Sequence, residues 1–356
     1  MKVIVFCASL QTGGAERVLS VLSKPFADHY DEVEYVTWYN TPIFYSIDDR
    51  IKLVSIEKEC KGKSILKKMM WLRKYIRTGQ PDVILSFSAP FNMLILTSLL
   101  FLKKKIIVCE RTDPRSFRWG KHLELLRNAL YLNTTGILTQ TQISKSYFKG
   151  KLLAKTSIIY NPISMDLNDV GSALREKKEN LIVTAARLAK EKRHDLLIRS
   201  FAKFRLDFPD YKLIIYGEGA ERNRLNNLIK DLGLENCVFL PGKVKDLWIR
   251  IRTAKVFIMT SKVEGMSNSM IEAMALGIPT ISTRVSGATD LINNNENGIL
   301  VNPDIDEIYN ACYKICTDRN IAIKLGSNGI KIFDRLKVEK ISKEWIDYID
   351  SITNSK

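Results

Sequence analysis

Short apolar runs alternate with longer segments of helical periodicity along the chain. In the first half, the runs predict strands at about residues 2–7, 33–38, 83–87, 106–109 and 136–139. Segments between them predict helices, which include one from about residue 15 and others at 65–77 and 122–130. Strands that alternate with helices are typical of βαβ units built on a parallel sheet.

The same alternation returns in the second half, after an Asn161-Pro162 break and a polar stretch at 166–180 that reads as a linker or surface helix. Many of the apolar runs there are continuous, as expected when helices cover both faces of a sheet. Strands are predicted at about 181–184, 211–216, 237–240, 256–260, 280–283 and 298–301. Helices are predicted at about 193–206, 222–232, 246–253, 269–276, 305–317, 321–333 and 338–354.

These elements predict an α/β protein of two Rossmann-like domains that face each other across a cleft. A length of 356 residues suits two domains, which we place at residues 1–163 and 164–356. The last helix, at about 338–354, either stays with the second domain or packs back on the first. Ligands of such sheets bind outside the carboxyl ends of the strands, so both domains should present their loops to the cleft.

The cysteines and the apolar segments indicate the compartment. The six cysteines are scattered and form no CxxC pair, which favours reduced thiols in a cytoplasm. The first apolar run, at residues 1–7, is too short for a signal peptide and has no cleavage site. The longest run, at 93–102, falls short of the roughly 20 residues that span a bilayer. We therefore expect a cytoplasmic protein.

Positive charge is concentrated in the first half. The net charge is +16, and residues 51–160 alone hold 21 lysines and arginines against 6 aspartates and glutamates. Such a positively charged region could bind an anionic membrane face, a phosphate-bearing acceptor or nucleic acid. The basic amphipathic segment at 61–77 can lie on an anionic membrane, or it can be an ordinary helix with a solvated face.

Two cations flank a predicted strand-to-helix turn at the start of the second half. Arg187 ends the strand and Lys192 precedes the helix. A diphosphate can rest at such a turn, because a guanidinium and an ammonium both suit phosphate oxygens. The alternative is a solvated basic turn, since Lys190 and Arg193 lie in the same segment.

Two carboxylates, Glu264 and Glu272, follow a later strand of the same half. Gly265 lets the backbone approach a ligand, and Ser267-Asn268-Ser269 opens a helix whose free N–H groups point outward. A carboxylate is a good acceptor for ribose or sugar hydroxyls. The alternative for Glu272 is a capping box, in which Ser269 and Glu272 cap the helix start.

Glycine turns supply further candidate contacts. Gly13 and Gly14 stand between the first strand and its helix, where they either approach a phosphate or merely connect the two elements. Gly217 and Gly219 form a similar turn after the strand at 211–216. The first turn is not GxGxxG and has no well-placed acidic residue for a ribose, which argues against a dehydrogenase.

These motifs together resemble the family 4 retaining glycosyltransferases, which have the GT-B fold, and the resemblance covers nearly the whole chain. It implies that Glu264, Arg187 and Lys192 are catalytic, although Ala186 stands where a glycine often precedes the arginine. It implies a donor site formed by Gly13, Gly14, Gly217, Gly219, Gly265, Met266, Ser267, Asn268 and Glu272.

The Glu110-Arg111 pair departs from the pattern of many family members, which carry a histidine near this place. The pair is found in a bacterial surface-polysaccharide subset that this chain resembles. Glu110 could orient an acceptor hydroxyl and Arg111 could meet an acceptor phosphate. A buried, arginine-paired structural carboxylate is the alternative for Glu110.

The resemblance implies transfer of a sugar, with retention, from a nucleotide sugar, by family habit a UDP-sugar. The implied acceptor is an undecaprenyl-diphosphate-linked saccharide at the inner face of the plasma membrane, in O-antigen, capsule or exopolysaccharide synthesis. We expect no cofactor, no metal and no nucleic-acid partner. One alternative is another GT-B enzyme, such as a sugar-nucleotide epimerase. The other is a non-enzymatic basic nucleic-acid-binding protein, although the sequence lacks the interleaved aromatic residues on which bases usually stack.

Overall fold

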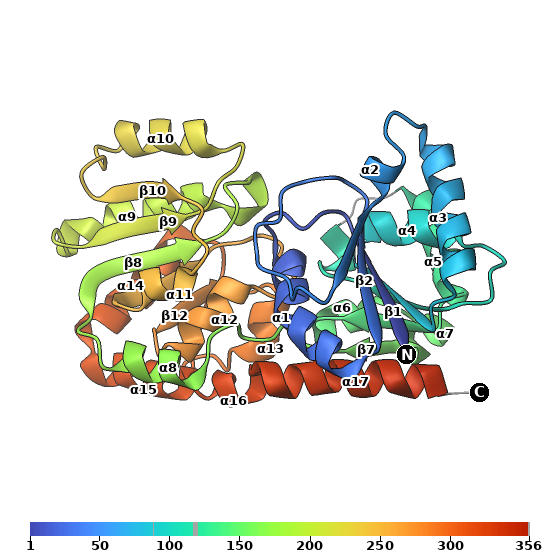
Figure 1. The fold of residues 1–356 in the computed structure, drawn as a ribbon. Helices are drawn as coiled ribbons and strands as arrows, with labels where there is room; N and C mark the ends of the chain where they lie inside the picture. Colours follow the sequence, from blue (N-terminus) through green and yellow to red (C-terminus); the bar gives the residue numbers. More distant parts are fainter. Residues whose placement is uncertain (88, 117–119, 355–356) are drawn as a thin grey trace. The chain divides into compact units, whose positions relative to one another are not determined.

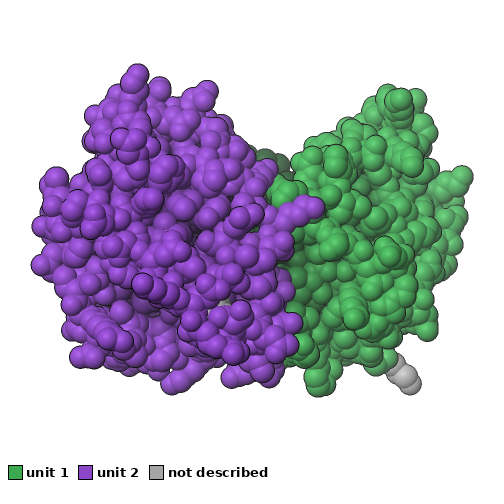
Figure 2. All heavy atoms as spheres, turned by 60° about the vertical axis from the view of Figure 1, so that its left-hand side comes forward, with its two compact units in different colours: residues 1–162, 338–356 green, residues 163–337 purple. Residues whose placement is uncertain are grey.

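The computed structural model describes residues 1–87, 89–116 and 120–354. The chain divides into two compact units (Figure 2). Unit 1 comprises Met1–Pro162 and Val338–Lys356, and unit 2 comprises Ile163–Lys337. The division after Pro162 lies one residue before the expected boundary, and the last helix belongs to unit 1 rather than to the second domain.

Unit 1 is built on a seven-stranded parallel sheet in the order β3-β2-β1-β4-β5-β6-β7 (Figure 1). Its strands are β1 (Lys2–Cys7), β2 (Glu32–Thr37), β3 (Lys52–Ser55), β4 (Val83–Phe87), β5 (Lys105–Cys109), β6 (Gly136–Thr139) and β7 (Thr156–Ile158). Its helices are α1 (Gly14–His29), α2 (Ile56–Glu59), α3 (Ile65–Gly79), α4 (Ala89–Ser98), α5 (Lys121–Leu132), α6 (Gln142–Tyr147), α7 (Gly150–Ala154) and α17 (Val338–Asn354).

The predicted inner strands of unit 1 are confirmed, whereas the edge strands β3 and β7 were not predicted. The inner strands β1, β4, β5 and β6 are nearly or fully buried and mostly apolar, which makes them visible in the sequence. The edge strand β3 is Lys-Leu-Val-Ser with an exposed Leu53, and it carries no comparable run. Edge strands need less apolar surface, and periodicity alone therefore misses them.

Unit 2 is built on a six-stranded parallel sheet in the order β10-β9-β8-β11-β12-β13. Its strands are β8 (Glu179–Ala185), β9 (Lys212–Tyr216), β10 (Val238–Gly242), β11 (Ala254–Met259), β12 (Thr280–Thr283) and β13 (Ile299–Val301). Its helices are α8 (Leu167–Leu174), α9 (His194–Asp207), α10 (Arg222–Asp231), α11 (Leu247–Ile251), α12 (Asn268–Ala275), α13 (Ser286–Leu291), α14 (Ile305–Thr317), α15 (Arg319–Gly329) and α16 (Ile332–Leu336).

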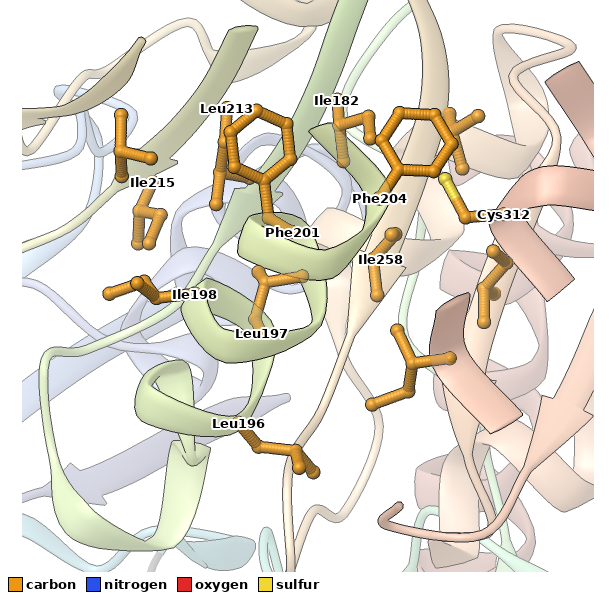
Figure 3. Packing of buried hydrophobic residues seen from close by; sticks show 14 of the residues in the cluster. Ile182, Leu196, Leu197, Ile198, Phe201, Phe204, Leu213, Ile215, Ile258 and Cys312 are labelled. Atoms are coloured by element: carbon orange, nitrogen blue, oxygen red, sulfur yellow. The ribbon is translucent and has the colours of Figure 1, made fainter. Parts of the chain in front are cut away.

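A core between α9 and the sheet holds unit 2 together (Figure 3). Phe201 and Phe204 of α9 are buried in the same cluster as Ile182 of β8, Leu213 of β9 and Ile258 of β11. Such a cluster removes apolar surface from water on one face of the sheet and fixes where α9 begins. The start of α9 and the end of β8 in turn position the loop between them.

The helix predicted at 321–333 is divided in the structure into α15 and α16. The break follows Gly329, which lies close to the backbone of α12. A Cβ added to Gly329 would lie 3.2 Å from the Met274 carbonyl oxygen. Glycine is a poor helix former, and here it permits a close approach to α12.

The last helix, α17, packs against α1 in unit 1. Its Trp345 is fully buried and stacks on Phe87 with ring centroids 5.6 Å apart. Near the helix end, Asp350 accepts a hydrogen bond from Tyr30 and lies 3.0 Å from His29 Nε2. The first 162 residues therefore do not complete unit 1 without α17.

In each sheet the order of the strands reverses at one place. The reversal lies between β1 and β4 in unit 1 and between β8 and β11 in unit 2. The loops at the carboxyl ends of these strand pairs diverge, and α/β proteins bind ligands in the space that this leaves. Among the helices that the structure describes, none combines the length and the apolar character needed to cross a bilayer.

Candidate functional site

The loop between β8 and α9 carries both predicted diphosphate-binding cations, but it exposes them differently. The side chain of Arg187 is 69% exposed and pairs with Glu191 at 3.0 Å. Lys192 lies in the short 3-10 helix at Lys190–Lys192 and is buried. Arg187 is thus available to a ligand, while Lys192 lies deeper in the same loop.

Lys192 forms an ion pair with Glu264, which brings together two of the three predicted catalytic residues. Glu264 lies in the loop after β11 and also accepts a hydrogen bond from Ser261 at 3.2 Å. The Thr260 hydroxyl donates to the backbone oxygens of Lys192 and Arg193, each at 3.0 Å. The loops after β8 and β11 are therefore tied together at the reversal point of the sheet.

Glu272 lies inside α12 and is buried. Its Oε1 accepts a hydrogen bond from the Ser164 hydroxyl at 3.0 Å. The helix is capped instead by Ser267, whose hydroxyl accepts from the Met270 amide. Because the N-cap is Ser267 and not Ser269, the capping-box alternative for Ser269 and Glu272 is wrong.

The start of α12 is held by its own serines. Ser269 donates to the backbone oxygen of Ala185 at 2.7 Å, and its hydroxyl lies 3.0 Å from that of Ser267. Met266 and Ser267 are buried, and Asn268 is the first helical residue. The bond to Ala185 joins the predicted donor-binding segment to the end of β8.

Gly217 and Gly219 have a structural reason to be glycine. Gly217 has φ of +145°, and a Cβ there would lie 1.9 Å from the Ala186 carbonyl oxygen. A Cβ on Gly219 would lie 2.3 Å from the Leu188 carbonyl oxygen. Both glycines let the turn after β9 press against the backbone that carries Arg187.

Gly265 contacts a third glycine that the sequence did not single out. A Cβ on Gly287 of α13 would lie 2.3 Å from the Gly265 carbonyl oxygen. The loop with Glu264 is thus packed between α13 and the β8 loop, which limits its freedom to move.

In unit 1, Gly13 and Gly14 stand at the start of α1, where Gly13 is the N-cap residue. A Cβ on Gly13 would lie 2.0 Å from a carboxylate oxygen of Glu16. The acidic side chain therefore covers the positive end of the α1 dipole. A bound phosphate at this turn would have to displace that carboxylate.

Glu110 and Arg111 follow β5 in unit 1 and point to different partners. Glu110 is buried and accepts from the Tyr131 hydroxyl at 2.5 Å, and Tyr131 in turn accepts from Asn92 at 3.0 Å. Arg111 donates to the Asn161 side chain at 2.6 Å and lies over the Phe87 ring. Glu110 is thus a buried carboxyl with a tyrosine partner, and its predicted contact with an acceptor would require this network to open.

Burial raises the pKa of the Glu110 carboxyl to about 7 from 4.5. Because the folded pKa is the higher one, the folded protein keeps a proton that the unfolded chain loses between pH 4.5 and 7. We expect stability to fall over this window by about 3 kcal/mol relative to Glu110→Gln, which does not titrate. Urea unfolding at a series of pH values checks this, and parallel stability curves for the two proteins would contradict it.

His194 is buried at the start of α9, and its Nε2 lies 3.1 Å from the Arg187 backbone oxygen. Burial lowers the pKa of its imidazole to about 4 from 6.5. The folded protein therefore resists a proton that the unfolded chain takes up, and stability falls as the pH drops from 6.5 to 4. We expect a loss of about 3 kcal/mol relative to His194→Gln, measured by urea unfolding. An unchanged pH dependence in the variant would contradict a neutral His194.

Several residues that support the site were not predicted as site residues. Thr260, Ser164 and Asn161 act through hydrogen bonds between segments distant in sequence, and nothing in their local sequence shows such partners. His194 is likewise buried against the Arg187 loop, which its local sequence does not indicate. Across the described ranges, no three His, Cys, Asp or Glu side chains gather in a group that could hold a metal ion.

Comparisons with known proteins show which proteins the chain is similar to. The model of the family "Glycosyl transferases group 1" matches residues 168–332, which lie within unit 2. A Campylobacter jejuni protein, GalNAc-alpha-(1->4)-GalNAc-alpha-(1->3)-diNAcBac-PP-undecaprenol alpha-1,4-N-acetyl-D-galactosaminyltransferase, is 27% identical over 100% of both chains. A second C. jejuni protein, N-acetylgalactosamine-N,N'-diacetylbacillosaminyl-diphospho-undecaprenol 4-alpha-N-acetylgalactosaminyltransferase, is 28% identical over 97% of this chain and 99% of its own.

Solved structures share the fold. Anabaena Alr3699/HepE in complex with UDP has a TM-score of 0.81 at 18% identity, covering 99% of this chain and 100% of that one. A TarM mutant from S. aureus, solved with UDP, has a TM-score of 0.82 at 15% identity over 99% and 100% of the two chains. The two parallel sheets match these GT-B structures, and the predicted fold class is confirmed. Residues 168–332 are similar to the glycosyl transferases of group 1, and the chain is a glycosyltransferase.

Proposed function

We propose that this enzyme transfers a sugar, with retention of configuration, from a UDP-sugar to an undecaprenyl-diphosphate-linked saccharide in the synthesis of a cell-surface polysaccharide. The observation that carries the donor side is the joining of the loops after β8 and β11 through Lys192 and Glu264. Cations and carboxylates at the reversal point of a parallel sheet suit a diphosphate and its attached sugar.

In this proposal, Arg187 and Lys192 bind the diphosphate and stabilise the charge that grows on it as the bond to the sugar breaks. The buried Lys192 contributes most, because a charge in a poorly hydrated site interacts more strongly than an exposed one. The acceptor oxygen attacks from the face that the diphosphate leaves, and its proton passes to a leaving phosphate oxygen. Glu264 accepts hydrogen bonds from the sugar, and Glu272 accepts them from the ribose.

The acceptor side rests on two kinds of support. The two C. jejuni relatives are named for transfer to undecaprenol-linked saccharides. In addition, residues 51–160 carry the excess positive charge of the chain, which suits a diphosphate-bearing lipid in an anionic membrane. We place the protein at the inner face of the plasma membrane, held there peripherally through the basic helix α3.

The test is donor turnover in the purified full-length protein, measured as UDP release from a panel of UDP-sugars with a lipid-linked acceptor present. Arg187→Ala and Glu272→Ala should each lower turnover about a hundredfold or more, the scale for losing one transition-state contact. Rates like those of the wild type in both variants would overturn the donor site. UDP-sugar conversion without any acceptor would favour an epimerase instead.

We also propose that the reaction needs no divalent metal, because Arg187 and Lys192 can take the role of the cation. Turnover in a chelator such as EDTA should match turnover with added Mg²⁺ or Mn²⁺. A loss in chelator that added metal restores would contradict this part of the proposal alone.

A further inference from the structure

Four helices form one layer on a single face of the sheet in unit 1. Helices α3, α4, α5 and α7 all contribute buried residues to one core cluster with that sheet, among them Leu72, Leu96, Leu130 and Leu152. In this layer α4 contacts both α3 and α5, and α5 contacts α7 (Figure 1). The outward sides of these helices therefore share one face of the unit, which we call the outer helical face.

On this face, α5 presents leucines to solvent. Leu125 is 66% exposed, and Leu123, Leu126 and Leu132 are also exposed. Leu125, Leu126 and Leu132 join exposed Lys121, His122 and Ala129 in one arc around the helix, while Leu130 and Tyr131 face the core. The exposed arc of α5 is thus mainly apolar, which is costly in water unless another surface covers it.

Helix α3 adds an exposed stripe of mixed character to the same face. Leu66 and Met70 are exposed one turn apart, with exposed Lys67 and Lys74 beside them. Residues 61–77 contain seven basic residues and no acidic one. Long lysine stems can lie along an apolar surface while their ammonium groups reach anionic groups.

Acidic side chains do little to offset this charge. The acidic residue of α5, Glu124, accepts a hydrogen bond from Tyr147 and lies 3.9 Å from Arg127. Beyond α4 the exposed Phe101 is followed by Lys103, Lys104 and Lys105, and α7 adds exposed Lys151 and Leu153. Exposed apolar groups interleaved with an excess of cations suit binding to an anionic lipid surface.

We propose that the outer helical face rests on an anionic bilayer, with the leucines of α5 entering the acyl region and the cations of α3 contacting lipid phosphates. The proposed function includes contact with the membrane, and this proposal identifies the surface that makes the contact. It rests on the proposed function only in taking the acceptor to be lipid-linked. Charge complementarity favours a bilayer over a protein partner, since the cations are spread across several helices. The exposed leucines argue against nucleic acid as the partner, because its phosphates bind cations and not apolar side chains.

The experiment is sedimentation of the full-length protein with vesicles of phosphatidylcholine alone or with phosphatidylglycerol added. The wild type should bind the anionic vesicles and not the neutral ones. Leu125→Ser with Leu126→Ser should weaken binding at least about tenfold, because less apolar surface enters the lipid. Lys67→Glu with Lys74→Glu should weaken it about tenfold or more, since each cation near the surface contributes.

The matched control is Leu206→Ser in α9 of unit 2, where the leucine is 84% exposed and lies outside the proposed face. It should bind the vesicles as the wild type does, and thermal unfolding should show all variants folded. The proposal is overturned if the wild type ignores anionic vesicles or if the α5 variant binds them normally. A dimer that the α5 variant dissociates would assign the face to a second copy and also overturn it. None of these outcomes depends on turnover, so a failure of the proposed surface can be distinguished from a failure of the proposed sugar transfer.

Discussion

Replacing Lys192 by alanine is expected to lower the rate of sugar transfer about a thousandfold. This is a larger effect than we expect for Arg187→Ala, because Lys192 is buried whereas the Arg187 side chain is 69% exposed. A desolvated cation stabilises growing charge on a leaving diphosphate more strongly than a hydrated one. The measurement is kcat from UDP release under saturating donor.

The control is Lys190→Ala, which removes a lysine of the same short 3-10 helix that is exposed. It should keep the rate within a fewfold of the wild type. If both lysine variants lost the same small amount of activity, Lys192 would be only the structural partner of Glu264, and the leaving group would need another stabilising cation.

Replacing Gly217 by alanine is expected to destabilise unit 2 by about 3 kcal/mol. The residue has φ of +145°, and the new Cβ would lie 1.9 Å from the Ala186 carbonyl oxygen. A backbone atom cannot rotate away as a side chain can, so the turn after β9 and the Arg187 loop must separate. Thermal unfolding measures the loss, and binding of UDP should weaken with it.

Gly171→Ala supplies the control for this change. Gly171 lies within α8 of the same unit, and a Cβ there would come no closer than 3.9 Å to Arg175 Nη2. Alanine is the better helix former, so this variant should be as stable as the wild type or more so. Equal stability of the two alanine variants would show that the turn after β9 adapts without cost.

Much of the fold could be predicted because buried parallel strands leave a strong pattern. The inner strands β1, β4 and β5 are mostly apolar and buried, and helices α1 and α3 are amphipathic. The pattern failed where burial is partial, as in edge strand β3, and where a glycine divides one periodic segment, as at Gly329. The missed strand β3 and the undivided helix at 321–333 have the same origin. Periodicity reports which residues are buried and does not report the hydrogen-bond partners of a segment.

The sequence indicated candidate site residues by their type and spacing, but it did not indicate their contacts. Charge and spacing indicated Arg187, Lys192, Glu264 and Glu272, yet the pairing of Lys192 with Glu264 depends on strands β8 and β11 being neighbours. The burial of Glu110 beside Tyr131 likewise depends on how α5 packs. Sequence separations of tens of residues hide such contacts, and only the topology of the sheet reveals them.

The return of α17 to unit 1 has a consequence for how the chain matures during synthesis. Unit 2 is continuous, from Ile163 to Lys337, and can close its core as soon as those residues have emerged. Unit 1 begins first but lacks Trp345 until after unit 2 has been made. The nascent first unit must therefore wait with the surfaces of Phe26 and Phe87 uncovered, a stage at which chaperones have their clearest target.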